Sequence, residues 1–322
     1  MTIQTPHFTL TAGARVIAIG ECMVELARGS DGRFGLAYGG DTFNTAVYMA
    51  RGGVDVGYAT ALGDDPYSAG ILALAETERV GTSLIEIMAG RMPGLYVIET
   101  TPEGERTFRY WRDAAAARDL FEGVNADATA AAISAAGLIY FSGVTLSLYK
   151  TKGLDVFAAA LTAARANGAV IVMDSNYRPR GWGDDHVRAR STFERFWRLS
   201  HIGLPTFDDE QMLWNDATPT DTANRLANLG PTEIVIKNGA AGAMVRAGGR
   251  DRLIVAPPLA AKPVDTTAAG DSFNAAYIAR RMSGCTSDDA AAHAHALAAV
   301  VIQHPGAIVP AWATDEVVSR SR

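Results

Sequence analysis

The sequence predicts an α/β fold in which a mostly parallel central sheet is flanked by helices on both faces. The 322 residues are 48% apolar and 20% charged, which is enough apolar surface for a large core. Short β-branched runs alternate with alanine-rich helical stretches along most of the chain. Most of these runs are apolar throughout, as parallel strands covered on both faces require.

Each element is expected where that alternation places it. The expected strands are residues 15–19, 57–61, 138–141, 170–174, 202–204 and 233–236. The expected helices are residues 45–51, 69–78, 154–167, 208–214, 221–229, 272–281 and 288–303. Residues 128–149 carry no charge, but glycine, serine and threonine interrupt them. We therefore interpret them as helix, buried strand and loop, and expect no membrane span.

One aromatic-rich segment breaks the alternation. Residues 94–112 are typical of two strands joined by a turn around Pro102 to Gly104. Together with residues 22–38 they would form a small sheet over one end of the core. We expect a single domain of residues 1–322, with lid segments at about 22–38 and 92–113.

Composition excludes several classes of function. The net charge of −6 argues against a nucleic-acid-binding protein and against binding to a membrane surface, so the expected partner is a small molecule. Cys22 and Cys285 are too few for a disulfide framework or a zinc site. Residues 1–13 lack the pattern of a secretory signal. A cytoplasmic location is expected.

The most informative motif is Val-Asp-Thr-Thr-Ala-Ala-Gly-Asp-Ser-Phe-Asn at residues 264–274, which leads directly into a helix. The backbone N–H groups from Ala268 through Ala269 and Gly270 to Asp271 would be unpaired there, and with the helix dipole they favour a phosphoryl group. Asp271 would accept the proton of an attacking hydroxyl. The alternative is that these residues only form a turn and a helix cap.

A second motif, Tyr-Gly-Gly-Asp-Thr-Phe-Asn at residues 38–44, also precedes a helix. Gly39 and Gly40 would let the backbone lie against a sugar. Asp41 and Asn44 would offer hydrogen bonds to its hydroxyl groups. The alternative is an ordinary turn and helix start.

A third motif, Val-Ile-Lys-Asn-Gly-Ala-Ala-Gly at residues 235–242, ends a strand in a glycine-spaced turn. Alone it is compatible with an ordinary strand connection. Together the three motifs resemble those of the ribokinase-like, or PfkB, carbohydrate kinases. The family pattern Asp-Thr-x-Gly-Ala-Gly-Asp is matched at residues 265–271, with Ala268 where glycine is usual. The chain has neither a P-loop nor a protein-kinase motif.

The resemblance implies a ribokinase-like fold and phosphoryl transfer from ATP, assisted by Mg²⁺, with Asp271 as the general base. It implies nucleotide contacts from Lys237, Gly239, Gly242, Thr267 and His295. No side chain is expected to form a dedicated metal site. Whether a monovalent cation such as K⁺ is needed near Asp265 and Thr267 stays open. Family members are often oligomeric, which implies a homo-oligomer.

Four further strings, at residues 19–26, 92–96, 104–112 and 174–180, resemble the branch of the family that phosphorylates 2-keto-3-deoxygluconate to 2-keto-3-deoxy-6-phosphogluconate. That resemblance implies sugar-acid contacts from Tyr96, Tyr110, Arg112 and Arg178. A guanidinium group binds a carboxylate through two hydrogen bonds, so we expect the two arginines to clamp the acid. Arg106, Arg109 and Arg180 are expected to be structural or solvated and not ligands.

Two other functions stay open at this point. The first is a kinase of the same family that acts on a neutral sugar, such as fructose or ribose, or on a nucleoside, with Arg112 and Arg178 as bystanders. The second is a silent sugar-binding regulator, which would need no base at Asp271. The C4 epimer accepted by a sugar-acid kinase also stays open.

Overall fold

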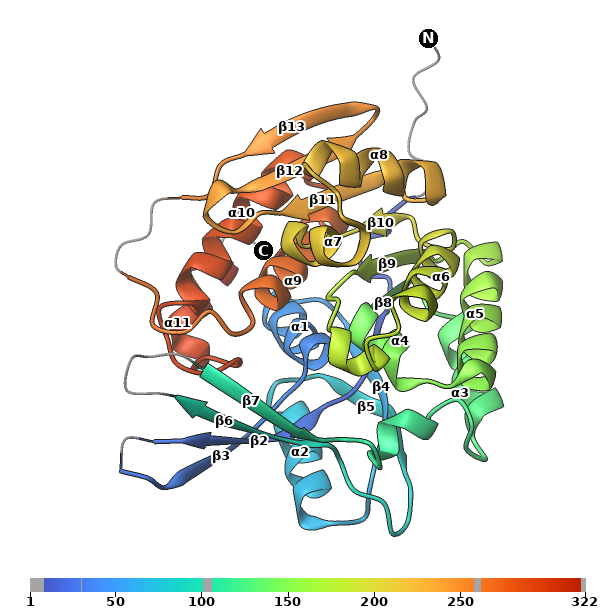
Figure 1. Ribbon diagram of the computed structural model, residues 1–322, viewed down its shortest axis with the longest axis vertical. Helices are drawn as coiled ribbons and strands as arrows, with labels where there is room; N and C mark the ends of the chain where they lie inside the picture. Colours follow the sequence, from blue (N-terminus) through green and yellow to red (C-terminus); the bar gives the residue numbers. More distant parts are fainter. Residues whose placement is uncertain (1–8, 30, 101–105, 258–261, 320–322) are drawn as a thin grey trace.

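The computed structural model describes residues 9–29, 31–100, 106–257 and 262–319. A large sheet runs through the body of the molecule, and a small one lies at one end of it (Figure 1). The strands of the large sheet are β1 (Val16–Ile19), β4 (Val56–Leu62), β5 (Gly81–Ile87), β8 (Leu138–Ser142), β9 (Val170–Asp174), β10 (Ile202–Gly203), β11 (Glu233–Lys237), β12 (Ala243–Ala247) and β13 (Arg250–Ile254). Its order is β13-β12-β11-β10-β9-β8-β1-β4-β5, and all pairs are parallel except β11 with β12 and β12 with β13.

Helices cover both faces of the large sheet (Figure 1). One face carries α1 (Asp41–Arg51), α2 (Pro66–Thr77), α9 (Ala269–Met282), α10 (Ser287–Val301) and α11 (Ala311–Ser319). The other carries α3 (Ala126–Ser134), α5 (Thr151–Ala166), α6 (His186–Trp197), α7 (Phe207–Trp214) and α8 (Pro219–Leu229). Shorter elements are α4 (Gly143–Leu148), η1 (Ala116–Asp119), η2 (Pro179–Trp182) and η3 (Gly239–Ala241).

The apolar character of the strands follows from this double cover. In β1, Val16 and Ala18 belong to the core under α1 and α9, while Ile17 and Ile19 belong to the core under α3 and α5. Successive side chains point to opposite faces, so both faces of a covered strand need apolar residues. The expected α/β fold with helices on both faces is confirmed.

The small sheet contains β2 (Met23–Arg28), β3 (Phe34–Gly39), β6 (Leu95–Thr100) and β7 (Arg106–Trp111), in the order β3-β2-β6-β7. The expected pairing of the residue 22–38 segment with the residue 94–112 hairpin is therefore confirmed. We call these four strands the lid sheet. The turn expected at Pro102 to Gly104 lies outside the described residues.

Each of the six expected strands and seven expected helices forms, with ends shifted by a few residues. One expectation was wrong: residues 143–148 form helix α4 and not a loop. Ser142 caps this helix, because its Oγ accepts a hydrogen bond from the Thr145 N–H at 3.2 Å. None of the helices in the described part of the chain has the length and apolar character that a membrane crossing requires.

The sheet topology singles out one place for a site. Strand β1 pairs with β4 on one side and with β8 on the other. From β1 the chain first adds β4 and β5 on one side, and then adds β8 to β13 on the other, so the strand order reverses at β1. In open α/β sheets, ligands bind beyond the carboxyl ends of the strands at such a point. Glu21, Ser142 and Asp174 lie at or just beyond the ends of β1, β8 and β9.

Candidate active site

Helix α9 presents its N-terminal end to this crevice. Its N-cap, Ala268, has φ 59° and ψ 15°, a left-handed conformation that is unusual for alanine. No side chain of the described residues caps this end. The Ala269 N–H was expected to be unpaired, but it donates to the Thr266 carbonyl at 3.2 Å. The N–H groups of Gly270 and Asp271 belong to the open first turn and attract an anion.

Asp271 is the third residue of α9 and is partly buried. Its Oδ2 accepts a hydrogen bond from Asn44 Nδ2 at 2.8 Å. Burial, followed by the nearby Asp41 carboxylate, raises the pKa of Asp271 to about 7. A carboxylate with this pKa exchanges a proton readily near neutral pH, which suits general base catalysis.

The N-terminal end of α1 lies beside that of α9. Asp41, the first residue of α1, accepts a hydrogen bond on Oδ2 from Asn176 Nδ2 at 2.6 Å. Thr45 Oγ donates to the Asp271 carbonyl at 3.3 Å, which joins the two helices. The sugar motif at residues 38–44 and the phosphate motif at residues 264–274 are thus brought together, and both helix dipoles point their positive ends at the same place.

Gly40 is required here by close packing. Its φ of 176° is accessible to any residue, but a Cβ at this position would lie 2.0 Å from the Glu21 carbonyl oxygen. The Gly40 N–H donates to Asn44 Oδ1 at 3.3 Å. The glycine therefore lets α1 begin directly against the end of β1, and its N–H orients the Asn44 amide.

Lys237 lies in a buried polar network below α9. Its Nζ donates to Asp174 Oδ2 and to Asn274 Oδ1, each at 3.0 Å. Asn274 Nδ2 donates to the same Asp174 oxygen at 2.7 Å and to the Tyr140 hydroxyl at 3.0 Å. A Cβ on Gly270 would lie 3.7 Å from Lys237 Nζ. The ammonium group thus lies just beneath the phosphate motif.

Sequence reasoning did not select three residues of these networks, namely Asp174, Asn176 and Asn274. Asn274 is part of the phosphate motif itself, three residues after Asp271 and therefore on the same side of α9. Asn176 has φ 29° and follows the end of β9. The sequence did contain signals for both: Asn274 lies within the motif, and Asn176 lies just after an expected strand.

The glycines of the third motif have different roles. Gly242 has φ 97°, and a Cβ there would lie 2.3 Å from the Ile254 carbonyl oxygen, so glycine is required between β11 and β12. Gly239 has φ 51° at the start of η3, and a Cβ there would meet open space. Lys237 is the last residue of β11, so this turn begins just beyond it.

The segment that precedes α9 is tied to the stretch of chain that follows α10. The Thr267 N–H donates to Asp265 Oδ1 at 2.9 Å, and the Gly306 N–H donates to Asp265 Oδ2 at 2.7 Å. His295 on α10 packs edge-on against Phe273, with ring centroids 4.9 Å apart. Burial lowers the pKa of His295, so its imidazole is neutral at neutral pH. Its Nε2 is buried without a hydrogen-bond partner in the described structure.

The lid sheet brings Tyr96 and Tyr110 to the sugar motif. Tyr96 on β6 donates its hydroxyl to the Glu25 carboxylate, and a Cβ on Gly39 would lie 3.0 Å from that hydroxyl oxygen. The Tyr96 and Tyr110 rings are 5.9 Å apart. Burial raises the pKa of Tyr96, so the phenol keeps its proton.

A pocket of about 370 Å³ lies between β7, η1, α4 and η2. It is lined by Tyr110, Arg112, Asp113, Arg118, Ser147, Arg178, Pro179, Arg180 and Gly181. We call it the arginine pocket. It contains both arginines expected to clamp an acid, and two more. Arg180 was expected to be structural or solvated, and it is exposed, although it lines this pocket. Arg118 was not considered, because nothing in the surrounding alanine-rich run distinguishes it.

Both expected clamp arginines already have a carboxylate partner. Arg112 Nη2 pairs with Glu21 Oε2, and the Glu21 side chain is 1% exposed. Burial raises the pKa of Glu21, and Arg112 partly offsets this effect. Arg178 Nη1 lies 2.9 Å from Asp209 Oδ1. Sequence reasoning identified neither carboxylate as a partner.

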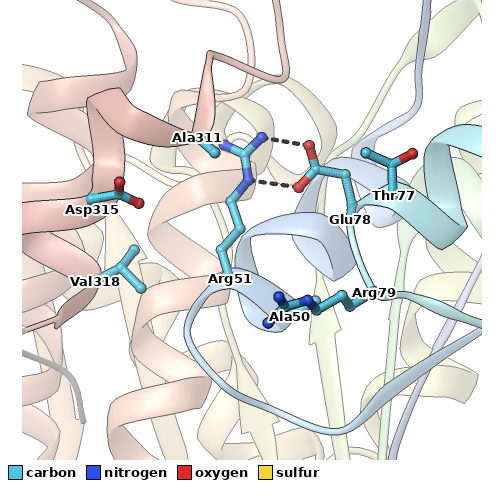
Figure 2. A pocket seen from close by; sticks show the side chains of 8 residues that line it. All are labelled: Ala50, Arg51, Thr77, Glu78, Arg79, Ala311, Asp315 and Val318. Carbon is cyan, nitrogen blue, oxygen red and sulfur yellow. Dashed lines mark hydrogen bonds and ion pairs between the residues drawn. The ribbon is translucent and has the colours of Figure 1, made fainter.

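A larger pocket, of about 430 Å³, lies elsewhere (Figure 2). Figure 2 shows Arg51 and Glu78 joined across it by two hydrogen bonds of 2.8 and 2.7 Å. Arg51 ends α1, an 11-residue helix whose first residue is Asp41. The length of that helix, roughly 15 Å, therefore separates this pocket from the two converging helix starts.

Comparisons with known proteins agree with this architecture. The model of the pfkB family of carbohydrate kinases matches residues 14–314. The chain is 41% identical to a 2-dehydro-3-deoxygluconokinase of Dickeya dadantii over 303 residues, which cover 92% of this chain and 96% of that protein. It is 39% identical to the protein of the same name from Escherichia coli K12 over 304 residues, or 92% and 97% of the two chains.

Solved structures show the same fold at lower identity. A 2-dehydro-3-deoxygluconokinase from Thermotoga maritima matches with a TM-score of 0.79 at 22% identity, covering 95% of this chain and 99% of that one. A putative ribokinase II from E. coli, in complex with ATP and Mg²⁺, matches with a TM-score of 0.81, also at 22% identity and with the same coverage. The ribokinase-like fold expected from the motifs is thereby confirmed.

Proposed function

This chain belongs to the pfkB family of carbohydrate kinases, and we propose that it transfers the γ-phosphoryl group of ATP to the 6-hydroxyl of 2-keto-3-deoxygluconate, also called 2-dehydro-3-deoxygluconate. The products would be ADP and 2-keto-3-deoxy-6-phosphogluconate. The observation that carries the substrate assignment is the arginine pocket beside the lid sheet, which suits a carboxylate. The names of relatives up to 41% identical support the same substrate.

Asp271 would act as the general base. As the 6-hydroxyl oxygen bonds to the γ-phosphorus, the O–H proton passes to the Asp271 carboxylate and the bond to the β-phosphate oxygen breaks. Backbone N–H groups of the Ala268–Gly270 turn and Asp271 would stabilise the charge on the transferring group, as would the α9 dipole. Ala269 itself contributes through backbone geometry, since its N–H already has a partner.

The sugar would lie between the α1 motif and the lid sheet. Asp41 and Asn44 offer hydrogen bonds to its hydroxyl groups, and the Gly39–Gly40 backbone allows it to approach closely. Tyr96 and Tyr110 would supply ring faces from above. Arg112 and Arg178 keep N–H groups beyond those in their ion pairs and would donate them to the acid.

ATP would lie along the β11 and α9 side of the crevice. Gly239 and Gly242 would shape the turn beneath the nucleotide, Thr267 would adjoin its phosphates, and Lys237 would support the phosphate motif from below. The neutral, buried His295 would border the adenine through its Nε2.

Mg²⁺ would come with the nucleotide. Within the described residues no group of three or more His, Cys, Asp or Glu side chains is arranged to hold a metal. Proteins commonly bind Mg²⁺ through substrate phosphates and few carboxylates. Its chemical contribution is to neutralise phosphate charge. A K⁺ ion near Asp265 and Thr267 is part of the proposal, and rates in K⁺ compared with tetramethylammonium salts test it.

Assembly and location complete the proposal. Phe34, Leu36 and Trp111 of the lid sheet are 49%, 53% and 60% exposed, which supports a homo-oligomer formed through that sheet. Light scattering after size exclusion measures this. Cys22 and Cys285 are free thiols, which agrees with a reducing cytoplasm.

The experiment is an ATP-consumption assay with 2-keto-3-deoxygluconate, its C4 epimer 2-keto-3-deoxygalactonate, fructose and ribose. We expect kcat/KM for the sugar acids to exceed that for the neutral sugars by at least about 100-fold, as loss of a charged hydrogen-bond partner generally produces. Preference for fructose or ribose would replace the substrate assignment. Tight sugar binding without phosphoryl transfer would favour a silent sugar-binding protein.

A further inference from the structure

The four arginines of the arginine pocket are not equivalent. Arg112 pairs with the buried Glu21, and Arg178 pairs with Asp209. Within the described residues, Arg118 and Arg180 have no ion-pair partner, although both line the same pocket. The pocket thus contains two guanidinium groups with a carboxylate partner and two without.

This difference decides which groups attract an anion. A carboxylate in contact with a guanidinium cancels most of its field at a distance, so a paired arginine still donates hydrogen bonds but adds little net charge. Glu21 pairs with Arg112 and Asp209 pairs with Arg178, while Asp113 lines the pocket. Arg118 and Arg180 are therefore the guanidinium groups left to meet the carboxylate of a substrate.

We propose that Arg118 and Arg180 are the residues that select an acidic over a neutral substrate, by supplying the unpaired positive charge for its carboxylate. Arg112 and Arg178 then donate hydrogen bonds to the same acid but, being paired with carboxylates, add little net charge. This inference rests on the proposed sugar-acid kinase function and assigns the charge recognition within it.

The surroundings of the two side chains differ, since Arg180 is exposed and Arg118 is half-buried. The Arg180 guanidinium lies over the Tyr110 ring, 5.6 Å from its centroid, so the lid sheet limits its movement. Its element, η2, packs tightly on α4, since a Cβ on Gly181 would lie 2.7 Å from Ser147 Oγ. Arg118 is half-buried at the end of η1, near enough to Glu21 to lower the pKa of that carboxyl without pairing with it.

The test compares two substrates that differ only in charge at C1. One is 2-keto-3-deoxygluconate, and the other is 3-deoxyfructose, which has CH₂OH in place of the carboxylate. For R118M and R180M, kcat/KM for the acid is expected to fall about 10- to 100-fold each, mainly through KM, as for a lost hydrogen bond to a charged group. For 3-deoxyfructose it should change less than about threefold, because that substrate carries no charge to pair.

Two variants serve as matched controls. Arg109 lies on the same hairpin, is 64% exposed, pairs with Glu99 and does not line the pocket, so R109M should leave both substrates unaffected. R180K keeps the charge and should recover part of the loss. Circular dichroism melts of each variant exclude a general loss of structure.

The outcomes separate this inference from the proposed function. If wild-type enzyme prefers 3-deoxyfructose, or phosphorylates neither substrate, the proposed function fails. If wild type prefers the acid, but R118M and R180M keep the wild-type preference ratio, the assignment of charge recognition is overturned. Equal losses for both substrates would also overturn it, because they indicate a structural role.

Discussion

The phosphate motif and the arginine pocket are built in different ways. At the N-terminal end of α9, backbone N–H groups and one carboxylate from a continuous stretch of chain form the binding element. The arginine pocket takes its side chains from β7, η1, α4 and η2, and two of its arginines depend on carboxylates elsewhere. In the proposed function, backbone geometry would support the phosphoryl transfer, whereas side chains and their ion pairs would select the substrate.

The largest expected effect isolates the phosphate motif. Asp271→Asn keeps the size of the side chain but removes the base, so kcat should fall about 10³-fold with little change in the KM for the sugar. Steady-state kinetics with 2-keto-3-deoxygluconate measures both constants. Turnover near the wild-type value would show that Asp271 is not the base. Another group would then have to accept the proton.

The next effect concerns the arginine pocket. Arg112→Met leaves the buried Glu21 carboxylate without a partner and should lower the free energy of unfolding by about 3 kcal/mol near neutral pH. The loss should shrink as the pH falls, because Glu21 then becomes protonated in the folded state. Urea unfolding at several pH values measures this.

A double variant checks the cause of that loss. Glu21→Gln combined with Arg112→Met removes both charges and should regain most of the stability lost by Arg112→Met alone. If the double variant is no more stable than the single one, the unpaired Glu21 charge is not the cause of the lost stability.

A smaller effect follows from the pKa of Asp271, raised to about 7 by burial and Asp41. A base must be deprotonated, so kcat should fall about tenfold per pH unit below that pKa and level off above it. The same pH series on Arg118→Met should show an unchanged midpoint, since the arginine pocket is a separate region. A shifted midpoint would show that the two regions are electrostatically coupled.

The smallest expected effect is at Ala268. Its left-handed backbone is strained for alanine, so Ala268→Gly should relieve strain of about 1 kcal/mol. The greater freedom of glycine in the unfolded chain offsets part of this gain. Thermal unfolding should therefore show a gain between zero and about 1 kcal/mol, and a clear loss of stability would contradict the strain argument.

The same contrast explains what the sequence predicted. The α9 and α1 starts were predictable because glycine, a carboxylate and a helix pattern are local signals. The structure then shows that the two segments meet. Helix α4 was missed although Ser142 and Thr145 have the spacing of a capping box.

Side-chain partners distant in sequence were beyond sequence reasoning. Arg112 and Glu21 are 91 residues apart, so no local pattern links them. Lys237 donates a hydrogen bond to Asp174, which is 63 residues away, so the buried network around its ammonium group could not be predicted either. Which arginines keep an unpaired charge is a property of the folded chain, because it depends on the carboxylates that tertiary packing brings next to them.

The amide of Asn44 gives the site a direction for proton movement. Its oxygen is committed to the Gly40 N–H, so its nitrogen must face Asp271 and donate to Oδ2. An oxygen that already receives an N–H is the poorer place for a second hydrogen. If Asp271 is the base, the proton taken from a substrate would therefore favour Oδ1, and an approaching hydroxyl would donate to that oxygen.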